Sequence, residues 1–86
     1  MDIETELGKL KNWKLQDNKI IKDFVFKNFA QTMIFINKVA EFAEELNHHP
    51  DMYISYNKVK IELTTHEVGG VSEKDFVLAK KIDDTN

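Results

Sequence analysis

The feature that most constrains the fold of this 86-residue chain is a broad apolar stripe between Asn28 and Leu46. Asn28 is a good helix N-cap, and Gln31 stands where a capping box needs it. Pro50 has a fixed φ and no N–H, so a helix here must end at or before His48. The apolar residues recur at spacings of three and four, which predicts a helix of about five turns with one buried face: Phe29, Met33, Phe35, Ile36, Val39, Ala40, Phe42, Ala43 and Leu46.

Two pairs of short β-type segments flank this helix and provide the layer against which it can pack. Residues 13–16 and 20–26 precede it, and residues 52–56 and 59–63 follow it. In the last segment apolar residues alternate with charged ones, which predicts a strand with one face buried and one face in solvent. The expected hairpin turns are Asp17-Asn18 and Asn57-Lys58.

Helical patterns also occur at both ends of the chain. Residues 2–11 form a short amphipathic pattern, and Gly69-Gly70 interrupts the chain before Ser72 and Asp75 open a last helix as a capping box. Residues 83–86 are expected to be a frayed polar tail. The order α-β-β-α-β-β-α predicts a single α+β domain, residues 1–86, with a four-stranded antiparallel sheet and three helices covering one face.

Composition excludes several classes of function. The chain has no cysteine, so disulfides, thiolate metal sites and cysteine nucleophiles are excluded. Its 12 basic residues are all lysine and its net charge is −3, which argues against a nucleic-acid or phosphate-clamping role. No stretch reaches the ~18 apolar residues of a membrane span, and the acidic N-terminus has no signal-peptide pattern. We therefore expect a cytoplasmic protein with no membrane or nucleic-acid partner.

Three histidines are the candidate functional residues. His48 and His49 come at the predicted helix C-terminus, where the helix dipole favours a protonated imidazole. Glu44, four residues before His48, would share a helical face with it and act in the same direction. His66 lies where the last strand meets a loop. These imidazoles could simply be capping or surface residues, but if the two loops meet at one end of the sheet, all three would line one cleft.

A metal site and an acid–base site are the two chemical interpretations of this cluster. Three histidines are enough to bind zinc. Neighbouring helical residues, however, point about 100° apart, whereas helical zinc ligands are usually spaced i, i+4. We therefore predict no metal and an acid–base site of the kind that serves an elimination or a hydration near neutral pH.

The spacing of these residues resembles the pterin-4a-carbinolamine dehydratase family over roughly residues 13 to 82. The resemblance rests on these positions: Glu44, His48-His49-Pro50, Tyr56, Val59, Leu63, Thr65-His66, Gly70-Val71-Ser72, Asp75 and Leu78-Ala79. It implies the same α+β fold, pairing through the sheet into homodimers or homotetramers, and metal-free removal of water from 4a-hydroxytetrahydropterin to give quinonoid dihydropterin. The pterin is the substrate, and no cofactor is implied.

The resemblance also implies roles for individual residues. His48, His49 and His66 would be catalytic; one imidazole would protonate the departing 4a-hydroxyl while another group takes the N5 proton. Glu44 would orient His48, and Pro50 would fix the direction of the histidine pair. Thr64 and Thr65 would either bind the pterin ring or simply end the strand. Asp75 would lie near the pterin, or serve as the third helical residue of a capping box.

Two other functions fit the same resemblance. Animal relatives also bind a transcription factor as a dimerisation cofactor, so the fold could serve as a non-catalytic protein-binding module. A proton-transfer role on another pterin, as in molybdopterin metabolism, is the second. Met52 stands where many members carry tryptophan, which affects one wall of the pocket and thus the pterin side chain accepted.

Overall fold

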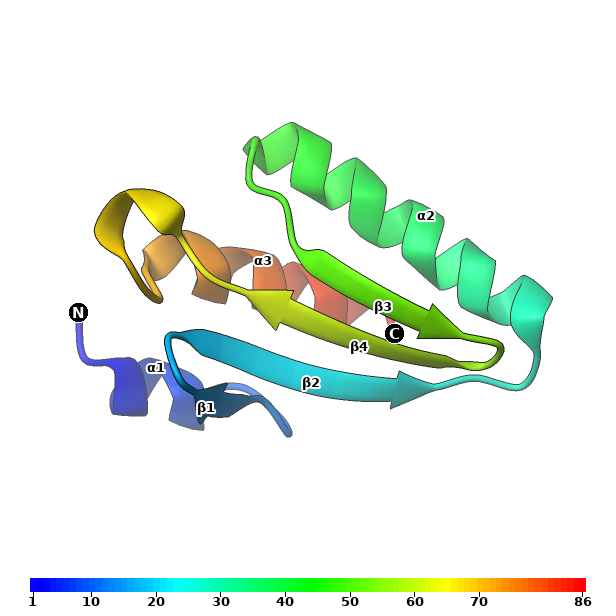
Figure 1. Cartoon of the computed structure of the whole chain (residues 1–86), viewed down its shortest axis with the longest axis horizontal. Coiled ribbons are helices and arrows are strands. Elements are labelled where there is room, and N and C mark those ends of the chain that lie inside the picture. The colour runs from blue at the N-terminus through cyan, green and yellow to red at the C-terminus, as the bar shows by residue number, and fades with distance from the viewer.

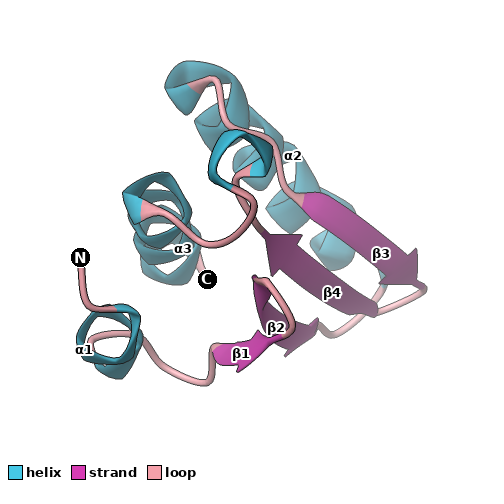
Figure 2. Ribbon diagram, turned by 60° about the vertical axis from the view of Figure 1, so that its left-hand side comes forward, coloured by secondary structure: helices cyan, strands magenta, loops and turns pink.

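The four strands of the computed structural model, which describes residues 1–86, form one antiparallel sheet in the order β1-β2-β4-β3. Helices α2 and α3 pack on one face of this sheet, and α1 lies on the same side, where Ile3 and Leu7 pack against the core (Figures 1 and 2). The predicted α+β fold is therefore confirmed. In chain order the elements are α1 (Ile3–Gly8), β1 (Lys14–Gln16), β2 (Lys19–Val25), α2 (Phe29–Leu46), β3 (Asp51–Ser55), β4 (Lys58–Leu63), the 3-10 turn η1 (His66–Val68) and α3 (Glu73–Thr85).

The core lies between the sheet and the helices, and β4 contributes most to it from the sheet side. Val59, Ile61 and Leu63 are all fully buried, as their alternation with charged residues predicts. Because β4 lies between β2 and β3, its inward side chains are covered on both flanks as well as by the helices. The core residues from the rest of the chain are Trp13, Ile20, Phe24, Phe35, Ile36, Val39, Phe76, Leu78, Ala79 and Ile82.

Helix α2 begins and ends through local hydrogen bonds. The Asn28 side chain accepts a hydrogen bond from the Gln31 N–H at 2.9 Å, which confirms the N-cap; the Gln31 side chain makes no reciprocal bond. At the other end Asn47 adopts the left-handed conformation, with φ 50° and ψ 44°. The His48 N–H then bonds back to the Ala43 carbonyl at 3.0 Å. The helix therefore stops at Leu46, and His48 is already outside it.

The β1–β2 hairpin turns at Asp17-Asn18, as predicted. The predicted tip of the second hairpin is wrong by one residue: Ser55 pairs with Lys58, so the turn is Tyr56-Asn57. Tyr56 has φ 52°, a left-handed conformation that a tyrosine rarely adopts. The Asn57 side chain supports this turn by donating to the Phe26 carbonyl at 3.0 Å.

The C-terminal residues differ from the prediction. Asp83 belongs to α3 rather than to a frayed tail. Its carboxylate accepts hydrogen bonds from Lys22 Nζ at 2.7 Å and from Trp13 Nε1 at 3.0 Å. These bonds tie the last turns of α3 to Trp13 and to strand β2, and the helix continues to Thr85. None of the helices combines the length and the apolar character needed to cross a membrane.

Candidate active site

Two connections meet at one end of the sheet and carry the predicted site residues. Residues 47–50 join α2 to β3, and residues 64–72 join β4 to α3. Asp51, the first residue of β3, pairs with Glu62 near the end of β4, so both connections leave the sheet at the same end of the strands. In Figure 1 the end of α2, the η1 turn and the start of α3 gather at this end of the sheet.

His48 is held by a buried carboxylate. Its Nε2 lies 2.6 Å from Asp75 Oδ1, a distance typical of a strong hydrogen bond to a charged group. The His48 side chain is 11% exposed and the Asp75 side chain 0%. The expectation that Glu44 orients His48 is wrong, because the left-handed Asn47 turns the chain before His48 and removes it from the helical face of Glu44.

Asp75 has two structural tasks. As the third residue of α3 it completes the predicted capping box, accepting from the Ser72 N–H at 2.9 Å. Its Oδ2 also accepts from Thr65 Oγ1 at 2.8 Å, and Thr65 Oγ1 lies 2.6 Å from Ser72 Oγ. The carboxylate that begins the last helix is therefore the same one that holds His48.

His49 points into solvent and pairs with Glu44. Its Nε2 lies 2.5 Å from Glu44 Oε2, with the two side chains 57% and 76% exposed. An ion pair this exposed contributes little to stability. It does, however, keep a second imidazole next to a carboxylate, one residue after His48.

The remaining predicted residues are placed as follows. His66 is exposed at the first position of η1, directly after buried Thr65, and its imidazole makes no hydrogen bond or ion pair within the chain. Thr64 Oγ1 donates to the Asn18 carbonyl at 2.7 Å and so holds the β1–β2 turn. Pro50 is partly buried and immediately precedes β3. Asp75 thus contacts both His48 and Thr65 directly. His49 and His66 do not take part in these contacts, but they are the residues that follow His48 and Thr65 in the chain.

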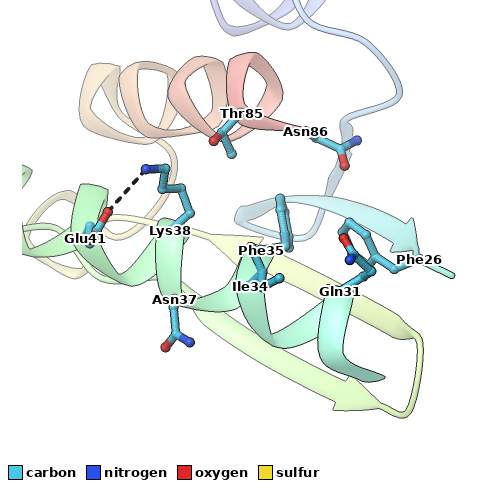
Figure 3. A pocket seen from close by; sticks show the side chains of 9 residues that line it. All are labelled: Phe26, Gln31, Ile34, Phe35, Asn37, Lys38, Glu41, Thr85 and Asn86. Carbon is cyan, nitrogen blue, oxygen red and sulfur yellow. Dashed lines mark ion pairs between the residues drawn. The ribbon is translucent and has the colours of Figure 1, made fainter. Parts of the chain in front are cut away.

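One hollow of the surface borders His48, and another lies far from the histidines. A groove of about 240 Å³ runs beside His48, with Leu46 and Val77 as its apolar walls. A larger hollow of about 620 Å³ lies away from all three histidines, between α2 and the end of α3 (Figure 3). Phe26, Ile34 and Phe35 form its apolar part. No group of three histidine, aspartate or glutamate side chains is arranged to hold a metal ion.

The sequence predicts Ser72 as a helix cap and as one position of the family pattern; its hydroxyl is in addition part of the network behind His48. The capping-box spacing was the available signal, since it placed Ser72 and Asp75 next to each other. The contact between His48 and Asp75 had no such signal, because 27 residues separate the two.

The arrangement can move protons. One histidine lies against a buried carboxylate and a second against an exposed one, so two imidazoles, which can exchange protons near neutral pH, stand side by side in the chain. No hydroxyl at this site has an imidazole as a hydrogen-bond partner.

Comparison with known proteins identifies the family. The model of "Pterin 4 alpha carbinolamine dehydratase" matches residues 1–85. A protein of Sulfolobus acidocaldarius, named "Putative pterin-4-alpha-carbinolamine dehydratase", is 48% identical over 81 residues, covering 94% of this chain and 89% of the relative.

Two solved structures have the same fold. A transcriptional coactivator/pterin dehydratase from Brucella melitensis superimposes with a TM-score of 0.92 and 34% identity, covering 95% of this chain and 89% of the other. A pterin dehydratase-like protein identified as a RuBisCO assembly factor in the alpha-carboxysome gives a TM-score of 0.69 and 26% identity, covering 84% of this chain and 83% of the other. From the match over nearly its whole length, the chain belongs to the pterin-4a-carbinolamine dehydratase family.

Proposed function

We propose that this protein is a 4a-hydroxytetrahydropterin dehydratase that removes water from its substrate by histidine acid–base catalysis, without a metal or cofactor. The observation that carries the proposal is the His48–Asp75 pair, a partly buried imidazole 2.6 Å from a fully buried carboxylate. The family match over residues 1–85 supports the pterin as the substrate class.

The reaction needs two proton transfers on one ring. The 4a-hydroxyl leaves as water when a proton is added to its oxygen, and the double bond between N5 and C4a forms as the N5 proton is removed. Imidazoles exchange protons near neutral pH and serve both steps. In this proposal His48, His49 and His66 carry the protons, and Glu44 acts on His49 rather than on His48.

The direct test is the rate of dehydration of a defined 4a-hydroxytetrahydropterin by chelator-treated protein. We expect the wild type to accelerate the reaction, and His49→Ala and His66→Ala each to lower kcat by about 10²–10⁴-fold, the usual contribution of a general acid or base. Both side chains are exposed, so the fold should be unaffected. A wild type without activity would refute the proposal, and unchanged turnover in either variant would remove that histidine from the mechanism.

A protein-binding role is the second candidate, because the relative described as a RuBisCO assembly factor has this fold. The hollow between α2 and α3 in Figure 3, which has an apolar part within a mostly polar lining, is remote from the histidines and offers a surface for such a contact. Activity that is lost in the histidine variants would favour the dehydratase; a wild type inactive on several pterins would favour the binding role.

We further propose that two or more copies associate through the sheet. Strand β3 is at one edge of the sheet, where its outer backbone groups have no strand partner. An exposed edge of this kind can pair with a second copy.

A further inference from the structure

The hydrogen bonds behind His48 fix the position of every proton in the network. Thr65 Oγ1 donates its only proton to Asp75 Oδ2 at 2.8 Å. Because that proton is used, the 2.6 Å contact between Thr65 and Ser72 requires Ser72 Oγ to be the donor. Ser72 also donates its backbone N–H to the same Oδ2 at 2.9 Å. Asp75 Oδ2 thus accepts two hydrogen bonds.

The remaining oxygen of Asp75 determines the tautomer of His48. An ionised carboxylate can only accept hydrogen bonds, so the imidazole nitrogen 2.6 Å from Oδ1 must carry a proton. That nitrogen is Nε2, which leaves Nδ1 of the neutral ring with a free lone pair. Nδ1 has no hydrogen-bond partner in the chain, and no buried side-chain nitrogen or oxygen lacks a partner, so Nδ1 must reach solvent.

We propose that Asp75, held by Thr65 and Ser72, is a positioning residue that keeps His48 in the Nε2–H tautomer, with Nδ1 as the proton acceptor of the site. The tautomer follows from the hydrogen-bond geometry around an ionised Asp75 carboxylate, whereas the acceptor role rests on the proposed dehydratase function. In this role His48 takes the proton from N5, and another group donates the proton to the 4a-hydroxyl.

The step is balanced as follows. The N5–H bond breaks and its proton passes to His48 Nδ1, while the electron pair forms the double bond between N5 and C4a. The C4a–O bond breaks and the oxygen, protonated by the second group, departs as water. His48 is then an imidazolium whose charge faces the buried Asp75 carboxylate, with 2.6 Å between Nε2 and Oδ1. Loss of this proton from His48 to solvent, and uptake of a proton from solvent by the second group, restore the starting state.

Replacing Asp75 by asparagine should reverse the tautomer. The hydrogen-bond donors of Thr65 and Ser72 both point at the Oδ2 position, so the amide oxygen must take that place. The amide nitrogen then faces His48 and donates to Nε2. His48 must respond by carrying its proton on Nδ1, and the acceptor of the site is lost. A misplaced tautomer of this kind costs about 10⁴-fold in kcat in a serine-protease triad.

The test is long-range proton–nitrogen NMR of the histidine rings in their neutral form. We expect a protonated Nε2 and an unprotonated Nδ1 in the wild type, and the reverse in Asp75→Asn. Glu44→Gln is the matched control, because Glu44 contacts only His49 and should leave the His48 signals as they are. An Nδ1–H tautomer in the wild type would overturn the positioning role, and this measurement does not depend on the variant folding.

Kinetics separate this inference from the proposed function. We expect Asp75→Asn to lower kcat by 10²–10⁴-fold with little change in KM. Thr65→Val should lower kcat less, and Thr65→Ser, which keeps the hydroxyl, should restore it. Reversal of the tautomer with full activity would overturn the acceptor role but not the dehydratase. The expected tautomers in a protein without dehydratase activity would refute the proposed function, and with it the acceptor role, but not the positioning of His48.

Discussion

Replacing Ile61 with alanine should lower the free energy of unfolding by about 3–4 kcal/mol. Ile61 is 0% exposed in the middle of β4, between Lys22 of β2 and Met52 of β3. Three carbon atoms are lost, which corresponds to roughly 2.4 kcal/mol of transfer free energy at ~0.8 per methylene. The strands on both sides hold the backbone in place, so the cavity cannot collapse fully, and its cost brings the total into the upper part of the usual 2–5 kcal/mol.

This loss is large compared with the whole stability of a chain of this length, roughly 4–13 kcal/mol. Urea unfolding followed by fluorescence suits the measurement, since the single tryptophan, Trp13, is buried in the core. With a slope of about 1.5 kcal/mol per molar urea, the midpoint should fall by about 2 M. Protein concentration must be the same in all samples, because association would stabilise the folded state.

Lys60→Ala is the matched control for Ile61→Ala. Lys60 is the adjacent residue of β4 and points to the open face of the sheet, so its loss should change the unfolding free energy by less than about 0.5 kcal/mol. Ile61→Val should lower the unfolding free energy by about 0.5–1.5 kcal/mol, which lies between the losses expected for Lys60→Ala and Ile61→Ala. Equal midpoint shifts for the alanine variants of Ile61 and Lys60 would show that the facing of β4 has been assigned incorrectly.

Three further predictions concern other contacts. Lys22→Met should cost about 2 kcal/mol by breaking the 2.7 Å bond to Asp83, and less in an Asp83→Asn background; additive effects in a double-mutant cycle would contradict this. Ile54→Pro on the edge strand β3 should shift sedimentation towards the monomer, and an unchanged assembly would place the interface elsewhere. The Glu62 carboxylate raises the pKa of Lys19 by hydrogen bonding and by its charge, so this pair stabilises the fold below about pH 10 and ceases to do so as the pH rises through the raised pKa. Thermal stability of Glu62→Gln should therefore approach that of the wild type at high pH; a constant difference would refute the linkage.

Periodicity predicted most of the fold because the buried faces follow simple repeats. The three-and-four spacing of α2 and the alternation of β4 each identify a face that must be covered. The structure buries the inner face of β4 and most of the α2 stripe, but Phe29 and Ala40 of that stripe are exposed. The Tyr56 turn was misplaced since its left-handed conformation falls on a tyrosine, where sequence gives no glycine signal. Asp83 was expected in a frayed tail because its partners, Lys22 and Trp13, are more than 60 residues away.

The candidate site was predictable residue by residue but not contact by contact. The spacing of His48 and Asp75 in the family pattern named both residues. Their pairing, however, depends on where α2 stops, and that is decided by the left-handed Asn47. With a helix one turn longer, Glu44 would have faced His48 as the i, i+4 rule implies. With the left-handed Asn47, Glu44 pairs with His49 instead, and His48 pairs with Asp75.

The double use of Asp75 has a consequence for divergence within the family. A relative that lost its chemistry would still need an aspartate here to begin the last helix, whereas nothing in the fold would retain exposed His49 or His66. Selection for folding alone would therefore preserve Asp75 and let the exposed histidines drift. Among descendants of this architecture, the histidines and not the aspartate should distinguish enzymes from scaffolds.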